Sequence, residues 1–197
     1  MLEQLAEPLL SWYDEHARIL PWREEPTAYR VWVSEIMLQQ TRVEAVKPYY
    51  ERFMEALPGI RELAACPEER LLKLWEGLGY YNRARNLKKA AEILVEEYEG
   101  VMPKDYEAVL ALPGIGSYTA GAVLSIAYEK CYPAVDGNVL RVLSRVTEDD
   151  RDILKQSVKK SIRRFNLAFE AALSRYMHKS SPPRGSWHCA AMPERVR

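Results

Sequence analysis

The chain has 197 residues, of which 48% are hydrophobic and 28% are charged, and this composition favours a folded core over disorder. Its N-terminus lacks the basic-then-apolar order of a signal peptide, and no stretch has the length and apolar character of a membrane span, so we expect a cytoplasmic protein with no membrane partner. Basic and acidic residues balance overall at 28 each, but residues 1–140 carry 15 basic against 22 acidic, whereas residues 141–197 carry 13 against 6.

The first element with a functional signal is the segment 29–46, YRVWVSEIMLQQTRVEAV. Glu35 lies there among apolar residues, at what we predict to be the start of a helix. A buried carboxylate is costly unless it is paired or used, so Glu35 is a candidate functional acid. The alternative is a solvent-facing carboxylate that complements the helix dipole in the first turn.

Two further helices are predicted by apolar residues that recur every three or four positions. One face runs through Leu71, Leu74, Trp75 and Leu78, and a second runs along residues 84–98. Turn residues near positions 58, 66, 100–103, 113–116 and 130–133 separate segments of helical length, and strand-like alternation is nearly absent. The predicted fold class is therefore all-α.

A glycine-rich hairpin is predicted at 105–128, with a helix to Leu112, a tight turn through Gly114 and Gly116, and a second helix of small residues. The two glycines allow a sharp turn that leaves backbone N–H groups uncovered beside the positive end of the second helix. Such a concave surface suits a phosphate. The alternative is an ordinary corner between two helices.

The second candidate acid is Asp136, in VDGNVLRVLSR at 135–145. It occupies the expected N-cap of a helix whose apolar face we assign to Val139, Val142 and Val146. Helix capping alone would explain an aspartate here.

Five segments together resemble a known family: LPWR at 20–23, SEIMLQQT at 34–41, GLGYYNRARNL at 77–87, LPGIGSYTAGAVLSIA at 112–127 and VDGNV at 135–139. Over roughly residues 8–147 the chain resembles the A/G-specific adenine DNA glycosylases, the MutY family, within the helix-hairpin-helix superfamily. The resemblance implies two helical lobes with the active site in the cleft between them. We expect residues 1–29 and 135–179 to form one lobe, 30–134 the other, and 180–197 an irregular tail.

The resemblance also implies a mechanism. Glu35 would protonate adenine so that it can leave, and Asp136 would stabilise the cationic sugar that remains. Relatives that also cut the strand carry a lysine two residues after the second hairpin glycine, where this chain has Tyr118. Because tyrosine cannot form a Schiff base, the implied reaction is hydrolysis alone, with Tyr118 and Asn138 positioning water and sugar around Asp136.

The expected partner is double-stranded DNA in which adenine is mispaired with 8-oxoguanine or guanine, bound by a monomer. The target base must leave the stack, and Gln40 and Tyr80 match the residues that fill the gap. Solvated helix faces and core packing remain the alternatives for this group. The other expected contacts are Arg23, Leu38, Gln39, Thr41 and Arg83, with Gly114 and Gly116 on a phosphate and Trp22 behind the adenine pocket.

The chain departs from the family after Asp136. Relatives usually hold a [4Fe-4S] cluster with four cysteines there and carry a further domain that reads 8-oxoguanine, but only Cys189 follows Asp136 in this chain. We therefore expect no cofactor and no metal. We also expect that the C-terminus arises from truncation or from a change of reading frame near Met177-His178.

Two other functions compete with this interpretation. An endonuclease III-type lyase that acts on oxidised pyrimidines is disfavoured by Tyr118 and Glu35. A non-catalytic DNA-binding remnant is suggested by the missing C-terminal cysteines.

Overall fold

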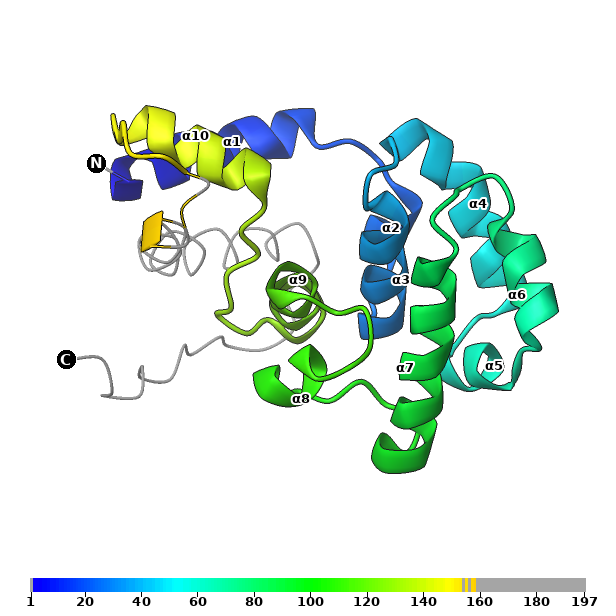
Figure 1. Ribbon diagram of the computed structural model, residues 1–197. Helices are drawn as coiled ribbons and strands as arrows, with labels where there is room; N and C mark the ends of the chain where they lie inside the picture. The colour runs from blue at the N-terminus through cyan, green and yellow to red at the C-terminus, as the bar shows by residue number, and fades with distance from the viewer. Residues whose placement is uncertain (1, 154, 156, 159–197) are drawn as a thin grey trace.

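The computed structural model describes residues 2–153, 155, 157 and 158. Within them the chain is helical and contains no strand, which confirms the all-α prediction. The helices follow one another through short connections, as Figure 1 shows. They are α1 (Leu2–His16), α2 (Pro21–Glu24), α3 (Ala28–Leu38), α4 (Val43–Ala56), α5 (Ile60–Ala65), α6 (Glu68–Trp75), α7 (Asn82–Tyr98), α8 (Tyr106–Leu110), α9 (Ser117–Tyr128) and α10 (Gly137–Val146).

The centre of the fold is the packing of α3 against α9. Helix α3 is apolar on most sides, with Trp32, Val33 and Met37 fully buried, so it must be surrounded by other helices. Helices α2, α4 and α7 contact it as well, and α5 and α6 pack on α7. The contact between α3 and α9 thus brings segments that are far apart in the sequence into one core.

The helices predicted from periodicity are present as α6 and α7, and the expected breaks all fall between helices. Leu78 lies beyond the end of α6 but is buried in the same core. Helices α7 and α9 both end on a glutamate with a left-handed backbone, Glu99 and Glu129, each at φ 57°. Glycine or asparagine is the usual residue at such a position.

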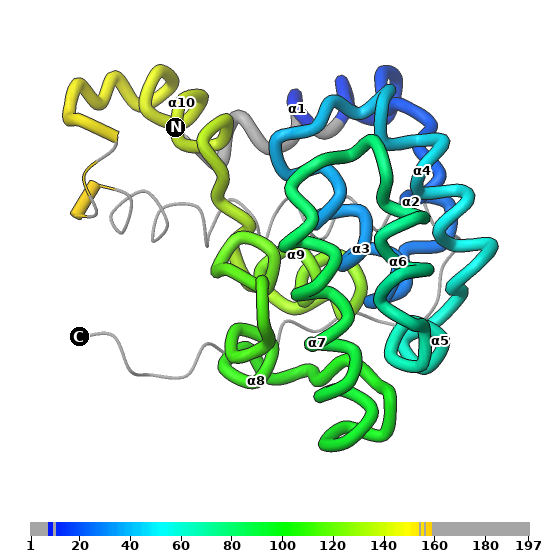
Figure 2. The backbone as a smooth tube through the Cα atoms, turned by 45° about the vertical axis from the view of Figure 1, so that its right-hand side comes forward, coloured from blue at the N-terminus to red at the C-terminus, as the bar shows by residue number. Residues whose placement is uncertain are grey.

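Gly121 allows the chain that follows α9 to fold back against that helix. A Cβ atom at Gly121 would lie 2.4 Å from the carbonyl oxygen of Pro133, a distance that no side chain can occupy. Figure 2 shows the chain running from α9 through residues 129–136 into α10. The close contact at Gly121 therefore helps to set where α10 begins.

The predicted apolar face of α10 is only partly correct. Val139 packs against the small core as expected, but Leu140 and Leu143 are the buried residues of this helix, and Val142 is 52% exposed. Valines and leucines form two neighbouring stripes on α10, and the larger leucines are the side chains that pack with Val135 and Val158 in a second, small core. Sequence periodicity alone could not decide between the two stripes.

The lobe boundaries stay a prediction. Leu20 and Trp22 belong to the same large core as α3 to α9, whereas Val135 and the leucines of α10 form the small one. The remainder of the expected first lobe beyond residue 158, and the expected tail at 180–197, lie outside the described residues.

Candidate active site

Glu35 lies in the last turn of α3, not at the start of a helix as expected. The alternative interpretation, a first-turn dipole interaction, is therefore wrong, because a carboxylate at a helix C-terminus faces the negative end of the dipole. Burial raises the pKa of the Glu35 carboxyl above its ordinary value. A hydrogen bond with Tyr118 lowers this pKa, the charge of Asp136 raises it, and the charge of Arg23 lowers it, with burial as the largest effect. The surroundings of Glu35 therefore stabilise its protonated form relative to that of a fully solvated glutamate.

Asp136 is the N-cap of α10, as predicted, and both of its carboxylate oxygens accept hydrogen bonds. One accepts from the backbone N–H of Val139 at 2.8 Å, and the other accepts from the side-chain amide of Asn138 at 2.9 Å. Arg141 in turn donates to the Asn138 oxygen at 3.1 Å. The carboxylate is therefore held in one orientation by its own helix.

All four predicted catalytic residues come together, from α3, α9 and the start of α10. Glu35 on α3 is hydrogen-bonded with Tyr118 on α9 and lies close enough to Asp136 for the charge of Asp136 to affect its pKa. Asn138 joins this group through its bond to Asp136. Two carboxylates in unlike surroundings, one partly buried with a raised pKa and one held by two hydrogen-bond donors, are suited to separate roles as acid and as anion.

The hairpin between α8 and α9 forms as predicted, although α8 ends at Leu110 instead of Leu112. Gly114 has φ +77°, and a Cβ atom there would lie 2.8 Å from the Cβ of Asn86. Gly116 is the N-cap of α9, is exposed, and would meet no atom within 4 Å if it carried a Cβ. Gly116 lies two residues before Tyr118 and has no side chain. It therefore leaves the N-terminus of α9 uncovered.

These two glycines give a testable contrast. Gly114→Ala should lower the free energy of unfolding by about 1–2 kcal/mol through left-handed strain alone, with a further loss from the contact with Asn86. Gly116→Ala should leave stability nearly unchanged, because its φ is −97° and the space is open. Urea unfolding of both variants checks this. Equal decreases in the free energy of unfolding for the two variants would contradict the left-handed backbone of Gly114 in this turn.

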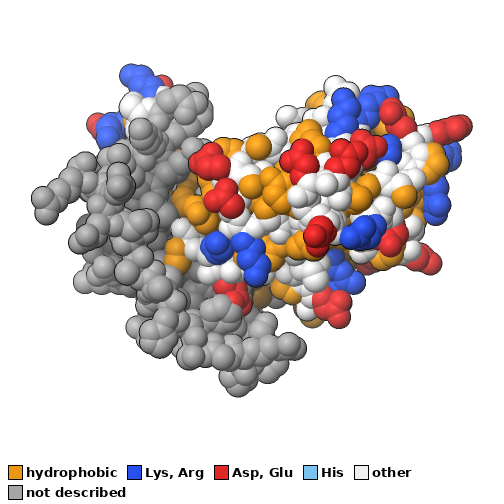
Figure 3. All heavy atoms as spheres, turned by 90° about the horizontal axis from the view of Figure 1, so that it is seen from below, with side chains coloured by type: hydrophobic (Ala, Val, Ile, Leu, Met, Phe, Trp, Pro, Cys, Tyr) orange, Lys and Arg blue, Asp and Glu red, His pale blue; other side chains and the backbone are white. Residues whose placement is uncertain are grey.

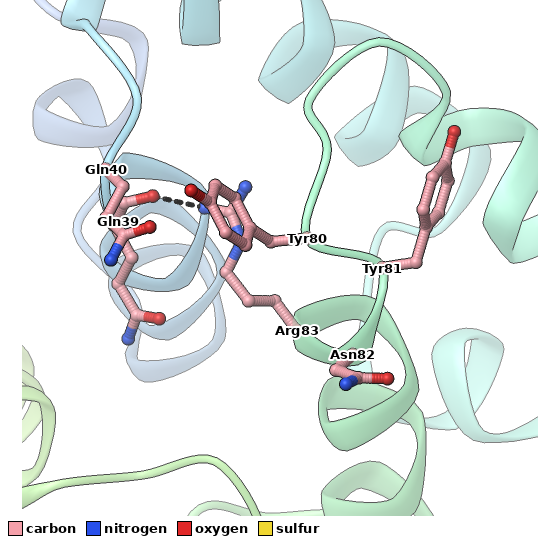
Figure 4. A pocket seen from close by; sticks show the side chains of 6 residues that line it. All are labelled: Gln39, Gln40, Tyr80, Tyr81, Asn82 and Arg83. Carbon is pink, nitrogen blue, oxygen red and sulfur yellow. Dashed lines mark hydrogen bonds between the residues drawn. The ribbon is translucent and has the colours of Figure 1, made fainter.

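A second group of predicted residues lines a pocket of about 360 Å³. Its walls are the end of α3 and the start of α7, and Figure 4 shows Tyr80 lying over Arg83 between them, whereas Tyr81 points away. Both Gln40 (φ 59°) and Tyr80 (φ 48°) have a left-handed backbone, which is uncommon for residues other than glycine. The lining residues are Gln39, Gln40, Tyr80, Tyr81, Asn82 and Arg83.

Arg83 makes contacts that the sequence did not predict. Its two terminal nitrogens, which carry four hydrogens between them, lie within hydrogen-bond distance of five backbone carbonyl oxygens, so a direct contact to a phosphate would require some of these bonds to break. No sequence motif signals such a set of partners, because the carbonyls belong to segments far apart in the chain.

The remaining predicted contact residues fall in different surroundings. Arg23 lies near enough to lower the pKa of Glu35, which places it beside the acid. Trp22 is buried and packs edge-on against Tyr50 with ring centroids 5.3 Å apart, so core packing accounts for its position. Leu38 is half-buried at the end of α3, and Thr41 lies just beyond it.

The surface shown in Figure 3 does not mark out a binding face by charge, because acidic and basic side chains are intermixed on it.

Neither a membrane-spanning helix nor a metal site is found in the part of the chain that the structure describes. Among the described residues, no helix has the length and apolar character that a membrane crossing requires, and no three His, Cys, Asp or Glu side chains are placed to hold a metal ion. The chain has three cysteines in all, which do not fit the four thiolate ligands of a [4Fe-4S] cluster.

An all-helical core with a glycine turn between two helices is the architecture of helix-hairpin-helix proteins. Residues 33–166 match the family described as the HhH-GPD superfamily of base excision DNA repair proteins, and the chain belongs to this family. Solved structures of similar fold include a thermostable thymine-DNA glycosylase (TM-score 0.78, 24% identity, 91% of this chain and 86% of that chain). They also include a trapped endonuclease III–DNA covalent intermediate (TM-score 0.71, 24% identity, 98% and 93%).

Curated proteins of similar sequence include several adenine DNA glycosylases. The adenine DNA glycosylase of Mus musculus is 50% identical over 147 residues, which cover 70% of this chain and 28% of that protein. Adenine DNA glycosylases of Buchnera aphidicola (subsp. Acyrthosiphon pisum) and Mycolicibacterium smegmatis are 46% and 43% identical, over 70% and 73% of this chain. The chain spans 39% and 50% of the length of these two proteins.

Proposed function

We propose that the chain is a glycosylase that hydrolyses the N-glycosidic bond of adenine mispaired with 8-oxoguanine or guanine in duplex DNA. The observation that carries this proposal is the partly buried Glu35, with its raised pKa, hydrogen-bonded with Tyr118 and close to Asp136. The names of the curated relatives support adenine as the base.

The chemistry requires both carboxylates. Adenine leaves deoxyribose slowly unless its ring is protonated, and a carboxyl kept protonated by burial can supply that proton. As the bond lengthens, positive charge develops on the sugar, and a fixed carboxylate beside it lowers the energy of the transition state. Glu35 is the proposed acid and Asp136 the proposed anion, since Asn138 and Val139 already hold Asp136 in place.

Binding would use the two other features of the site. The N-terminus of α9 after Gly116 is suited to a backbone phosphate, which positions the duplex without reading its sequence. Gln40 and Tyr80 would enter the space left by the extruded adenine, and the 67% exposure of Tyr80 makes its ring available for this.

The proposal is tested by single-turnover release of adenine from duplexes that carry adenine opposite 8-oxoguanine or guanine. Release above the uncatalysed rate by the unmodified chain supports it. If the unmodified chain and its Glu35→Gln and Asp136→Asn variants all release adenine at the same background rate, the non-catalytic alternative is correct.

Hydrolysis without strand cleavage is a separate part of the proposal. Tyr118→Lys puts an amine where strand-cutting relatives carry one, so we expect a covalent adduct with DNA on borohydride treatment of this variant and none with the unmodified chain. An adduct with the unmodified chain would favour the lyase alternative. The absence of any adduct with Tyr118→Lys would contradict the placement of Tyr118 beside the sugar.

A further inference from the structure

The two residues proposed to enter the duplex stand on different turns. Gln40 follows α3, and Tyr80 precedes α7. Each has a left-handed backbone that costs on the order of 1–2 kcal/mol for a residue with a Cβ, so each turn needs support from its surroundings. Both side chains line the same pocket (Figure 4).

Arg83 supports both turns, because its guanidinium contacts the end of α3 and the segment before Tyr80. Its Nη1 lies 3.0 Å from the carbonyl oxygen of Ile36, 3.1 Å from that of Met37 and 2.5 Å from that of Gln39, and its two hydrogens are shared among these three acceptors at the C-terminal end of α3. Its Nη2 donates to the carbonyls of Leu78 at 3.0 Å and Gly79 at 3.2 Å, directly before Tyr80. One planar group therefore joins the two turns.

Aromatic contacts hold the guanidinium between these segments. It lies 5.5 Å from the ring centroid of Trp75 and 5.6 Å from that of Tyr80. Trp75 also donates from its ring nitrogen to the Gly79 carbonyl at 3.1 Å, which fixes the same turn a second time. The positive charge of Arg83 interacts favourably with the faces of the two aromatic rings and with the negative end of the α3 dipole.

We propose that Arg83 is a positioning residue that fixes the separation of the turns carrying Gln40 and Tyr80, so that these two side chains enter the duplex as one unit. The proposal rests on the proposed function for its consequence in DNA, but the link between the turns is a property of the free protein. Lysine cannot replace arginine here, because a single ammonium lacks the planar fork that reaches both sets of carbonyls.

The experiment compares Arg83→Lys with Arg61→Lys in the full chain. Arg61 is a matched control because its guanidinium also donates to a backbone carbonyl, that of Glu99, at the opposite end of α7. Hydrogen exchange followed by mass spectrometry measures the opening of residues 38–41 and 78–81. In Arg83→Lys we expect faster exchange in both turns together, with residues 113–117 unchanged, and in Arg61→Lys no change in either turn.

The consequence in DNA is read with 2-aminopurine in place of the target adenine opposite guanine. We expect Arg83→Lys to lower the extruded fraction, and the single-turnover rate of adenine release roughly 10- to 100-fold, at a temperature where the variant is folded. Exchange that is unchanged in the two turns overturns the proposal, as does exchange that rises equally throughout the chain. If exchange rises in both turns but the unmodified chain neither extrudes nor releases the base, the link stands and the proposed function fails.

Discussion

Glu35→Gln is expected to reduce the single-turnover rate of adenine release by about 10²–10⁴-fold, the usual contribution of a general acid. Glutamine keeps the volume of the side chain and can still bond with Tyr118, but it cannot give a proton to the departing base. Binding to the mispaired duplex should change little. The matched control is Glu96→Gln on the exposed side of α7, which should react at the unmodified rate.

The same substitution should change stability in a way that depends on pH. Burial raises the pKa of Glu35 in the folded state above its ordinary value of 4.5, so the folded state binds the proton more tightly than the unfolded state does. The contribution of this group to stability is therefore fully present below the ordinary pKa and is lost as pH rises through the raised one. Glu35→Gln, which does not titrate, should melt at a higher temperature than the unmodified chain at neutral pH, with the difference shrinking towards pH 4. A lower melting temperature at neutral pH would contradict a buried, desolvated acid.

Asp136→Asn is expected to reduce adenine release by on the order of 10²–10³-fold, because it removes the fixed negative charge beside the cationic sugar. Asparagine is as good an N-cap as aspartate, so α10 should still begin at residue 137 and the melting temperature should change by only a few degrees. Measuring rate and melting temperature on the same preparation separates the two roles of this residue.

Asp105→Asn provides the control for capping. Asp105 is the N-cap of α8 and accepts from the backbone N–H of Ala108 at 2.9 Å, much as Asp136 accepts from Val139. Both variants should alter stability by similar small amounts, and only Asp136→Asn should lose activity. A large loss of stability in Asp136→Asn with proportionate loss of activity would reduce Asp136 to a structural cap.

The helices and the hairpin were predictable because their signals are local. Apolar spacing marks α6 and α7, two glycines mark the turn before α9, and an aspartate before an apolar helix marks the start of α10. The end of α3 was not predictable. It falls between Leu38 and Gln40, where the sequence has neither glycine nor proline, and the turn is made by a glutamine with a left-handed backbone. The structure therefore moves Glu35 from the expected start of a helix to its end.

The side-chain partners of Glu35 and Arg83 could not be predicted because they depend on long-range contacts. The bond between Glu35 and Tyr118 depends on the packing of α3 against α9, and the carbonyl partners of Arg83 come from the ends of two other segments. Neither partner choice follows from a motif, since each depends on how helices far apart in the chain dock. The separate roles that we propose for Glu35 and Asp136 could be predicted only through the family resemblance.

The left-handed glutamates that end α7 and α9 are positions at which substitutions can raise the stability of the protein. Glu99 and Glu129 carry the strain of a Cβ at positive φ, and their negative charges lie at the negative ends of their helices. Glycine or asparagine at these positions removes one or both costs. Neither residue belongs to the proposed site, so each is a position where a second-site change can offset a destabilising variant in the active centre. Tolerance to mutation near Glu35 and Asp136 therefore depends partly on helix ends that take no part in the reaction.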